Sequence, residues 1–308
     1  MSKVAIIGVG HVGAQVAADM VLRGTASELV LIDKNDKKAL AEYYDLTDQQ
    51  ALTREQTVVT AVPYAQNWDT LANCDVIVVA AGNIELTRQD GADRLAELPN
   101  SAQIVRDIAP KIKASGFDGI VINITNPCDV VATYLQQQIG LSTNQVIGTG
   151  TTLDTARMKR AVSTFFKCNM ADVSGFVLGE HGETQFTAWS TVAVAGVPIT
   201  HAAESSNIKL EDLKEEARLG GWHIMAGKGF TSNGIGLTAT VLTEAVLNDM
   251  RQSFPLSAYD AEKQIYIGQV TRIGKKGVLT HVDVKLTPDE QAAFDASAAA
   301  IQHNFSLI

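Results

Sequence analysis

One histidine, one aspartate and two arginines have residue types and spacings suited to proton transfer beside a bound anion. His181 lies in a glycine-flanked segment, residues 179–182, directly after an apolar strand pattern. Asp154 and Arg157 are three residues apart in a predicted helix, so their side chains fall on one face. Arg94 lies in a Gly- and charge-rich stretch. Together they supply a proton donor, an aspartate that sets the tautomer of the donor ring, and two cations. The cations are suited to the carboxylate and the carbonyl oxygen of a 2-oxo acid.

Each of these residues also has an ordinary explanation. Asp154 and Arg157 fit a helical ion pair, which is common and worth only about 0.2–0.5 kcal/mol. A lone loop histidine is more often a surface residue than a catalyst, and Arg94 fits a solvated charge. The chemical interpretation therefore depends on the fold bringing all four side chains to one place.

A parallel sheet is the element that would bring them together. Short β-branched runs alternate with helical patterns in the first half of the chain, as expected for strands buried on both faces. They occur at residues 4–7, 29–32, 76–79, 120–124 and 146–147. The stretch that contains Arg94 follows the third run, and Asn126 follows the fourth. Because α/β sheets bind ligands at the carboxyl ends of their strands, both are expected at a ligand site.

The first strand and helix are joined by a glycine pattern typical of dinucleotide binding. Residues 8–13 read Gly-Val-Gly-His-Val-Gly, and Asp33 ends the next strand. Gly8 permits the tight turn, Gly10 lets the backbone approach a pyrophosphate, and Gly13 lets helix and strand pack closely. Asp33 is suited to accept hydrogen bonds from a ribose 2′-OH and would repel a 2′-phosphate. The pattern therefore predicts NAD as the cofactor.

The second half of the chain mixes helices with antiparallel strands. Helices are predicted at residues 151–166, 208–219 and 236–251, and strands at residues 172–178, 189–194, 265–270 and 278–286. Gly220-Gly221 is expected to end the middle helix, and Thr287-Pro288-Asp289-Glu290 to start a terminal helix with a capping box. The prediction is an α/β fold: a Rossmann doubly wound parallel sheet in residues 1–147, followed by an α+β substrate domain in residues 148–308.

Composition excludes several classes of protein. The chain has 308 residues, 46% hydrophobic and 19% charged, which is unlike a disordered protein. Its 25 Lys and Arg against 34 Asp and Glu leave a net charge of −9, which argues against nucleic-acid or membrane partners. Neither a signal peptide nor a membrane span is recognised, so a cytoplasmic location is expected. Three scattered cysteines indicate neither a disulfide framework nor a metal site.

On its motifs the chain resembles the L-lactate/malate dehydrogenase family along nearly its whole length. The matching segments are residues 8–13, 126–129, 148–157 and 179–182. Within the family it resembles the L-2-hydroxyisocaproate dehydrogenases most, through residues 82–84, 93–98, 153–158, 179–182 and 227–232. The resemblance implies an NAD-dependent 2-hydroxyacid dehydrogenase that forms a homo-oligomer, a tetramer by analogy.

The resemblance also implies a role for each of the four residues. His181 would donate a proton to the carbonyl oxygen in the reductive direction, and Asp154 would hold the other ring nitrogen. Arg157 would bind the substrate carboxylate, and Arg94, on a closing loop, would polarise the carbonyl.

Five further residues are assigned to the site by the same resemblance. Asn126 and Thr231 would contact the substrate, with Asn126 also close to the nicotinamide end. Val12 and Gly82 would join the three motif glycines and Asp33 in binding the cofactor. Leu86 would line the pocket for the substrate side chain.

The resemblance also implies that the loop that carries Arg94 sets the substrate, because malate dehydrogenases use an arginine early in this loop to pair with a second substrate carboxylate. Its early positions, Asn83 to Leu86, hold no cation for a second carboxylate, so a branched or medium aliphatic 2-oxo acid such as 2-oxoisocaproate is expected. Gly234 is expected to leave extra room for it. Pyruvate is the alternative substrate, and oxaloacetate becomes one if Arg88 reaches inward. A different class of function, a non-catalytic NAD-binding sensor, also stays open.

Overall fold

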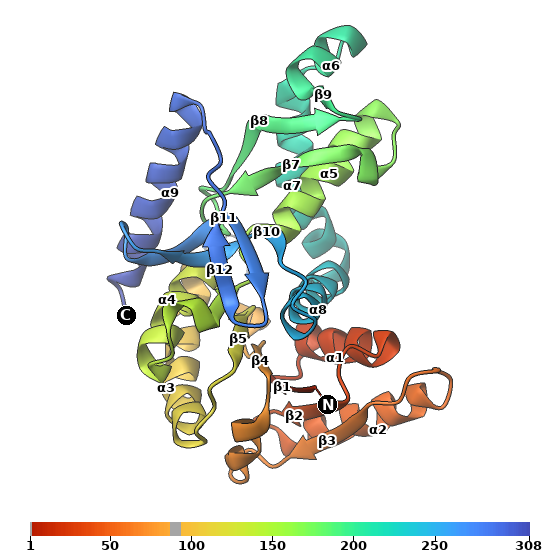
Figure 1. Ribbon diagram of the computed structural model, residues 1–308, viewed down its shortest axis with the longest axis vertical. Coiled ribbons are helices and arrows are strands. Elements are labelled where there is room, and N and C mark those ends of the chain that lie inside the picture. Colours follow the sequence, from red (N-terminus) through yellow and green to blue (C-terminus); the bar gives the residue numbers. More distant parts are fainter. Residues whose placement is uncertain (1, 87–93) are drawn as a thin grey trace.

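The computed structural model describes residues 2–86 and 94–308 and is built on one large mixed sheet (Figure 1). Six parallel strands come from the first half: β1 (Lys3–Ile7), β2 (Glu28–Ile32), β3 (Val58–Val62), β4 (Val76–Val79), β5 (Ile120–Asn123) and β6 (Val146–Gly148). Their order in space is β6-β5-β4-β1-β2-β3. The sheet reverses its winding at β1 and β4, as in a doubly wound fold. The predicted fold class is confirmed.

Helices cover both faces of this sheet because its strands are apolar on both sides. They are α1 (His11–Arg23), α2 (Asp36–Gln50), α3 (Leu98–Ala114) and α4 (Cys128–Ile139). In β1, Val4 and Ile6 join the core that contains α1, whereas Ala5 and Ile7 join the core that contains α3 and α4. Because successive side chains of a buried strand point to opposite faces of the sheet, β1 contributes to both cores.

Three antiparallel strands from the second half extend the same sheet beyond β6. They are β10 (Gln252–Asp260), β11 (Ile265–Gly274) and β12 (Gly277–His281), and β10 pairs with β6 through Ser257 and Gly148. Sequence patterns missed β3 and β10. In β10 the proline at position 255 argues against a central strand, yet the strand lies inside the sheet.

The rest of the second half forms a smaller sheet and further helices, of which the last two pack against the large sheet and its helices. The strands are β7 (Val173–Leu178), β8 (Phe186–Val194) and β9 (Val197–Pro198), and the helices are α5 (Thr152–Phe166), α6 (Ile199–Ser206), α7 (Leu210–Lys228), α8 (Asn233–Leu247) and α9 (Pro288–Phe305). Figure 1 shows α5, α6 and α7 around this sheet, away from α2 and α3. The capping box at Thr287 is confirmed. Within residues 2–86 and 94–308, no helix is long and apolar enough to cross a bilayer.

The boundaries of two predicted helices are wrong. The glycine pair at 220 and 221 does not end a helix, because α7 continues to Lys228 and is capped by Gly229 in the left-handed region. A Cβ on Gly221 would lie 3.3 Å from the Arg157 guanidinium, so the glycines allow α7 to pack closely on α5. The next helix begins at Asn233 and ends at Leu247, instead of spanning residues 236–251.

Candidate active site

A cavity of about 1030 Å³ lies where the carboxyl end of the parallel sheet meets the smaller sheet. Five residues singled out in the sequence line it: Asn126, Asp154, Arg157, His181 and Thr231. They come from segments after β5, β6, β7 and α7, which are far apart in the chain. The fold therefore brings together the predicted acid–base group, its predicted carboxylate partner and the cation predicted to bind the substrate.

His181 and Asp154 form the central pair of the cavity. The ring Nδ1 lies 2.6 Å from Asp154 Oδ2, and the aspartate is buried. Burial would raise the pKa of Asp154, but the charge and hydrogen bond of His181, followed by those of Arg157, hold it below its ordinary value. The carboxylate is therefore ionised and sets the tautomer of the ring. With Nδ1 engaged, proton exchange with a ligand falls to Nε2.

Arg157 contacts the other oxygen of the same carboxylate and has further N–H donors that can bind a ligand. Its Nη1 donates to Asp154 Oδ1 at 2.8 Å, and its side chain is only 13% exposed. Its Nε is buried and has no hydrogen-bond partner among the described residues. A buried guanidinium N–H without a partner is costly unless a ligand accepts from it. Arg157 is therefore suited to bind a carboxylate in the cavity.

Glycines at close backbone contacts hold these segments together. Gly150, at φ +50°, leads from β6 into α5, and a Cβ there would lie 2.3 Å from the Ser257 nitrogen. Gly179, at φ +90°, forms an antiparallel bridge with Gly268 just before His181. Both glycines are tied to the β10–β11 hairpin, which thereby fixes Asp154 relative to His181.

Residues 179–182, which contain His181 and are called the histidine loop below, are held by a buried carboxylate. The sequence motifs assigned no role to this carboxylate. Asp129, in the first turn of α4, accepts a hydrogen bond from the His181 backbone nitrogen at 2.7 Å and another from Ser257 Oγ at 2.5 Å. Burial raises its pKa to about 6. Its position directly after the Asn-Pro-Cys segment was the only signal in the sequence. Through these hydrogen bonds Asp129 connects α4, the histidine loop and β10.

Asp129→Asn is expected to change how stability depends on pH. A carboxyl whose pKa is raised on folding stabilises the folded state at low pH and loses that contribution as pH rises through about 6. Asparagine cannot ionise, so the variant should gain about 1.4 kcal/mol relative to the parent between pH 5 and pH 7.5. Urea unfolding at both pH values measures the difference. Asp69→Asn, at an exposed site, serves as the control; a pH-independent difference for Asp129→Asn would contradict the assignment.

The glycine loop is shaped as a dinucleotide cradle. A Cβ on Gly13 would lie 1.9 Å from the Gly8 carbonyl oxygen, so only glycine allows α1 to approach β1. At Gly10 the nearest atom to an added Cβ is 3.9 Å away, and Gly82 has nothing within 4 Å. Bare backbone at the start of α1 thus faces open space, as the close approach of a pyrophosphate requires.

Asp33 is held beside this loop at the end of β2. Its carboxylate accepts hydrogen bonds from the Val9 nitrogen and the Asn35 nitrogen, both at 2.9 Å. Val12 is half-buried in the first turn of α1 and packs against the core. These positions fit NAD, with the ribose at Asp33 and the pyrophosphate at the α1 N-terminus.

One contact across the site was not predicted at all. The ring of His11, inside the glycine loop, stacks on Phe230 with centroids 3.8 Å apart and planes 8° apart. Phe230 directly precedes Thr231, so the glycine loop contacts the segment that carries Thr231 to the cavity. No spacing in the sequence links these two aromatic rings.

The loop predicted to govern substrate choice is described only in part. Ile84 lines the cavity, whereas Leu86, in the same short 3₁₀ turn, is half-buried and is not among the described lining residues. Arg88 lies outside the described residues, as does the side chain of Arg94, whose backbone starts the 3₁₀ turn Arg94–Glu97. Gly234 adds no space for substrate: a Cβ there would lie 2.9 Å from Leu153.

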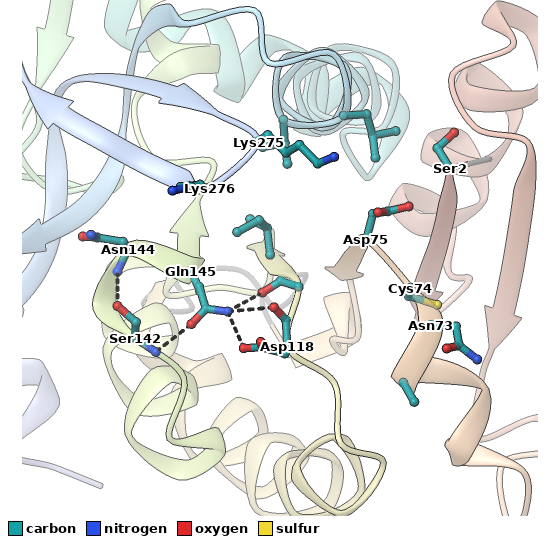
Figure 2. A pocket seen from close by; sticks show the side chains of 15 residues that line it. Ser2, Asn73, Cys74, Asp75, Asp118, Ser142, Asn144, Gln145, Lys275 and Lys276 are labelled. Carbon is teal, nitrogen blue, oxygen red and sulfur yellow. Dashed lines mark hydrogen bonds between the residues drawn. The ribbon is translucent and has the colours of Figure 1, made fainter.

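A second cavity, of about 930 Å³, lies at the opposite edge of the sheet (Figure 2). The segments before β4 and β5 contribute Asp75 and Asp118, and the β11–β12 turn contributes Lys275 and Lys276. Gln145 Nε2 donates to Asp118 Oδ1 at 3.1 Å. Its described lining contains no histidine, and carboxylates and ammonium groups balance there. The first cavity, which contains His181, is therefore the candidate site.

Comparison with known proteins gives matches along the whole chain. Residues 2–148 match the NAD-binding domain of lactate/malate dehydrogenases, and residues 151–307 match their alpha/beta C-terminal domain. L-lactate dehydrogenase 1 of Bifidobacterium longum is 34% identical, covering 98% of this chain and 96% of its own. L-lactate dehydrogenase of Priestia megaterium is 35% identical, covering 97% and 94%.

Solved structures agree with these matches. The ligand-bound minor L-lactate dehydrogenase of Enterococcus mundtii has a TM-score of 0.92 at 32% identity, covering 100% of this chain and 98% of its own. Lactate dehydrogenase of Cryptosporidium parvum, solved with lactic acid and NAD, has a TM-score of 0.93 at 27% identity, covering 99% and 97%.

Proposed function

This chain belongs to the lactate/malate dehydrogenase family, and we propose that, within it, the protein reduces 2-oxo acids that carry a branched or medium-length aliphatic side chain. Like its relatives it is an NAD-dependent oxidoreductase of 2-hydroxy acids. The observation that carries the proposal is the His181–Asp154 pair beside Arg157 in a cavity with a largely apolar wall.

The proposed mechanism assigns one task to each side chain. NAD, when bound, supplies or accepts the hydride. His181 Nε2 gives its proton to the carbonyl oxygen during reduction and takes it back from the hydroxyl during oxidation. Asp154 stabilises the protonated ring, and Arg157 pairs with the substrate carboxylate. Arg94 is proposed to polarise the carbonyl, with Asn126 and Thr231 beside the substrate.

The wall of the cavity supports an aliphatic substrate. Beside its charged residues, the cavity is lined by several apolar side chains: Ile84, Val177, Trp189, Ala217 and Met225. Among its described lining residues, Arg157 and Lys214 are the cations, and Lys214 already pairs with Glu211 at 2.7 Å. A second substrate carboxylate would therefore meet few partners there. The names of the relatives favour pyruvate as the second candidate.

A panel of three 2-oxo acids tests the proposal. The kcat/KM for 2-oxoisocaproate is expected to exceed that for pyruvate by about 10–60-fold, because three more buried carbon atoms are worth about 0.8 kcal/mol each. Oxaloacetate should be the poorest of the three. Steady-state oxidation of NADH measures all of them.

The other outcomes have distinct meanings. A higher kcat/KM for pyruvate makes the protein a lactate dehydrogenase, and a higher value for oxaloacetate points to Arg88 as a partner for the second carboxylate. Tight NADH binding with no turnover of any 2-oxo acid would support the NAD-binding sensor.

We propose the remaining assignments on the same basis. Residues 1–147 would bind NAD, and residues 148–308 would hold most substrate contacts. Leu22, Leu40 and Tyr44 are exposed on α1 and α2, which supports a homo-oligomer, a tetramer by analogy. The expected location is the cytoplasm.

A further inference from the structure

We infer that Gln185 is a positioning residue that holds Asp154 and sets how strongly His181 retains its proton. The inference rests on the proposed function, because it concerns the same acid–base pair. Gln185 lies four residues after His181, directly before β8, and it lines the same cavity. Nothing in its spacing marked it as functional.

The amide of Gln185 faces the aspartate carboxylate. With its nitrogen turned toward Asp154, Nε2 donates to Oδ2 at 3.0 Å and to Oδ1 at 3.2 Å. The opposite orientation would place the amide oxygen against two carboxylate oxygens, which repel it. The arrangement of partners therefore determines which amide atom points inward.

Three donors thus surround one buried carboxylate. Oδ1 accepts from Arg157 Nη1 at 2.8 Å, Oδ2 contacts His181 Nδ1 at 2.6 Å, and the Gln185 amide bridges both oxygens. Asp154 is only 4% exposed, so these contacts act in a low local dielectric. The bridging amide fixes the plane of the carboxylate and hence the direction of the bond to His181.

The turn before Gln185 is itself held in place. Glu180 accepts hydrogen bonds from the Thr184 nitrogen at 3.2 Å and from Thr184 Oγ1 at 2.7 Å. Ser297 Oγ, on α9, donates to the Thr184 carbonyl oxygen at 2.5 Å. These contacts close the turn and leave the Gln185 side chain directed at Asp154.

The electrostatic effect of the amide opposes that of the carboxylate. The negative charge of Asp154 stabilises the protonated His181 ring, whereas the positive end of the amide dipole weakens that charge. A reversible dehydrogenase needs a ring that releases its proton during reduction and recovers it during oxidation. When Arg157 turns donors toward a substrate carboxylate, Gln185 is the neutral donor that stays with Asp154.

Other charged groups also line the cavity, and all stay constant in a Gln185 variant. Those described come from the segment before α3, the histidine loop, α5, α7 and α9: Glu97, Glu180, Glu183, Asp154, Arg157, Lys214, Asp289 and Glu290. A change in the titration of His181 on replacing Gln185 therefore reports the amide.

The test compares the histidine titration in Gln185→Met with that of the parent. Methionine keeps the length and volume of the side chain and removes both N–H donors. The midpoint of the His181 ring titration, followed by NMR in the cofactor-free protein, should move up by about 0.5–1 pH unit. The chain has six histidines, so His181→Asn identifies the signal. The basic limb of the pH profile for 2-oxo acid reduction should move up by the same amount, since reduction needs the protonated ring.

A matched control and a second variant complete the test. Gln136→Met removes a comparable amide bond, from Nε2 to the Leu141 carbonyl oxygen at 2.7 Å in α4, and should leave the midpoint unchanged. Gln185→Ala should move it up like Gln185→Met and covers the case in which one variant misfolds. A folded Gln185 variant with an unchanged midpoint overturns the inference, even if turnover falls. Because the NMR readout needs no substrate, a wrong assignment of the 2-oxo acid does not affect it.

Discussion

His181→Asn is expected to lower kcat for 2-oxo acid reduction by about 10²–10⁴-fold, because proton transfer by a positioned acid contributes about that factor. Asparagine preserves a donor toward Asp154, which lies 2.6 Å from the ring Nδ1, so the loop should stay in place. It offers no group that gives up a proton to the carbonyl oxygen near neutral pH. Steady-state NADH oxidation at saturating substrate measures the loss.

Two controls separate this loss from a structural defect. NADH affinity, measured by fluorescence titration, should be unchanged, since the glycine loop is built from residues 8–13 and Asp33, away from the ring. His223→Asn, at an exposed position in α7, should retain full activity. A kcat for His181→Asn close to that of the parent would refute the acid–base assignment.

The sequence predicted those parts of the site that follow from strand topology. Polar residues after β4, β5 and β6 had to meet at one edge, because the carboxyl ends of parallel strands share that edge. Asp154 and Arg157 had to share a face of α5 because of their spacing. The cofactor loop was predicted from the combination of strand, glycines and Asp33, whose carboxylate indeed reaches the loop through the Val9 nitrogen.

The parts that escaped prediction depend on packing between distant segments. Asp129 reaches the His181 backbone across 52 residues, and the stacking of His11 on Phe230 joins opposite halves of the chain. Gly220 and Gly221 resemble a helix end in the sequence, whereas in the structure they lie inside α7, where the closeness of α5 and its Arg157 favours glycine. Local patterns carry no information about such neighbours.

Arg157→Gln is expected to lower kcat/KM by about 10²–10⁴-fold, equivalent to about 3–5 kcal/mol for removing one partner of a buried ion pair. Two features support so large an effect: Nε is buried without a partner among the described residues, and Gly221 packs against the guanidinium. Glutamine cannot supply a charged fork to the substrate carboxylate. Saturation kinetics should show the loss mainly as a raised KM, with NADH affinity unchanged.

Arg157→Lys tests whether substrate binding needs the paired N–H donors of the planar guanidinium or only its positive charge. Lysine restores a cation, but it offers a point charge in place of two parallel N–H donors, so it should recover only part of the lost kcat/KM. Arg160→Gln, three residues along the same helix, removes a surface pair with Glu216 at 2.9 Å and should change kcat/KM less than about twofold. Full activity in Arg157→Lys would show that a positive charge suffices at this position. Partial recovery, beside a silent Arg160→Gln, would make the planar guanidinium the group that orients the 2-oxo acid toward His181.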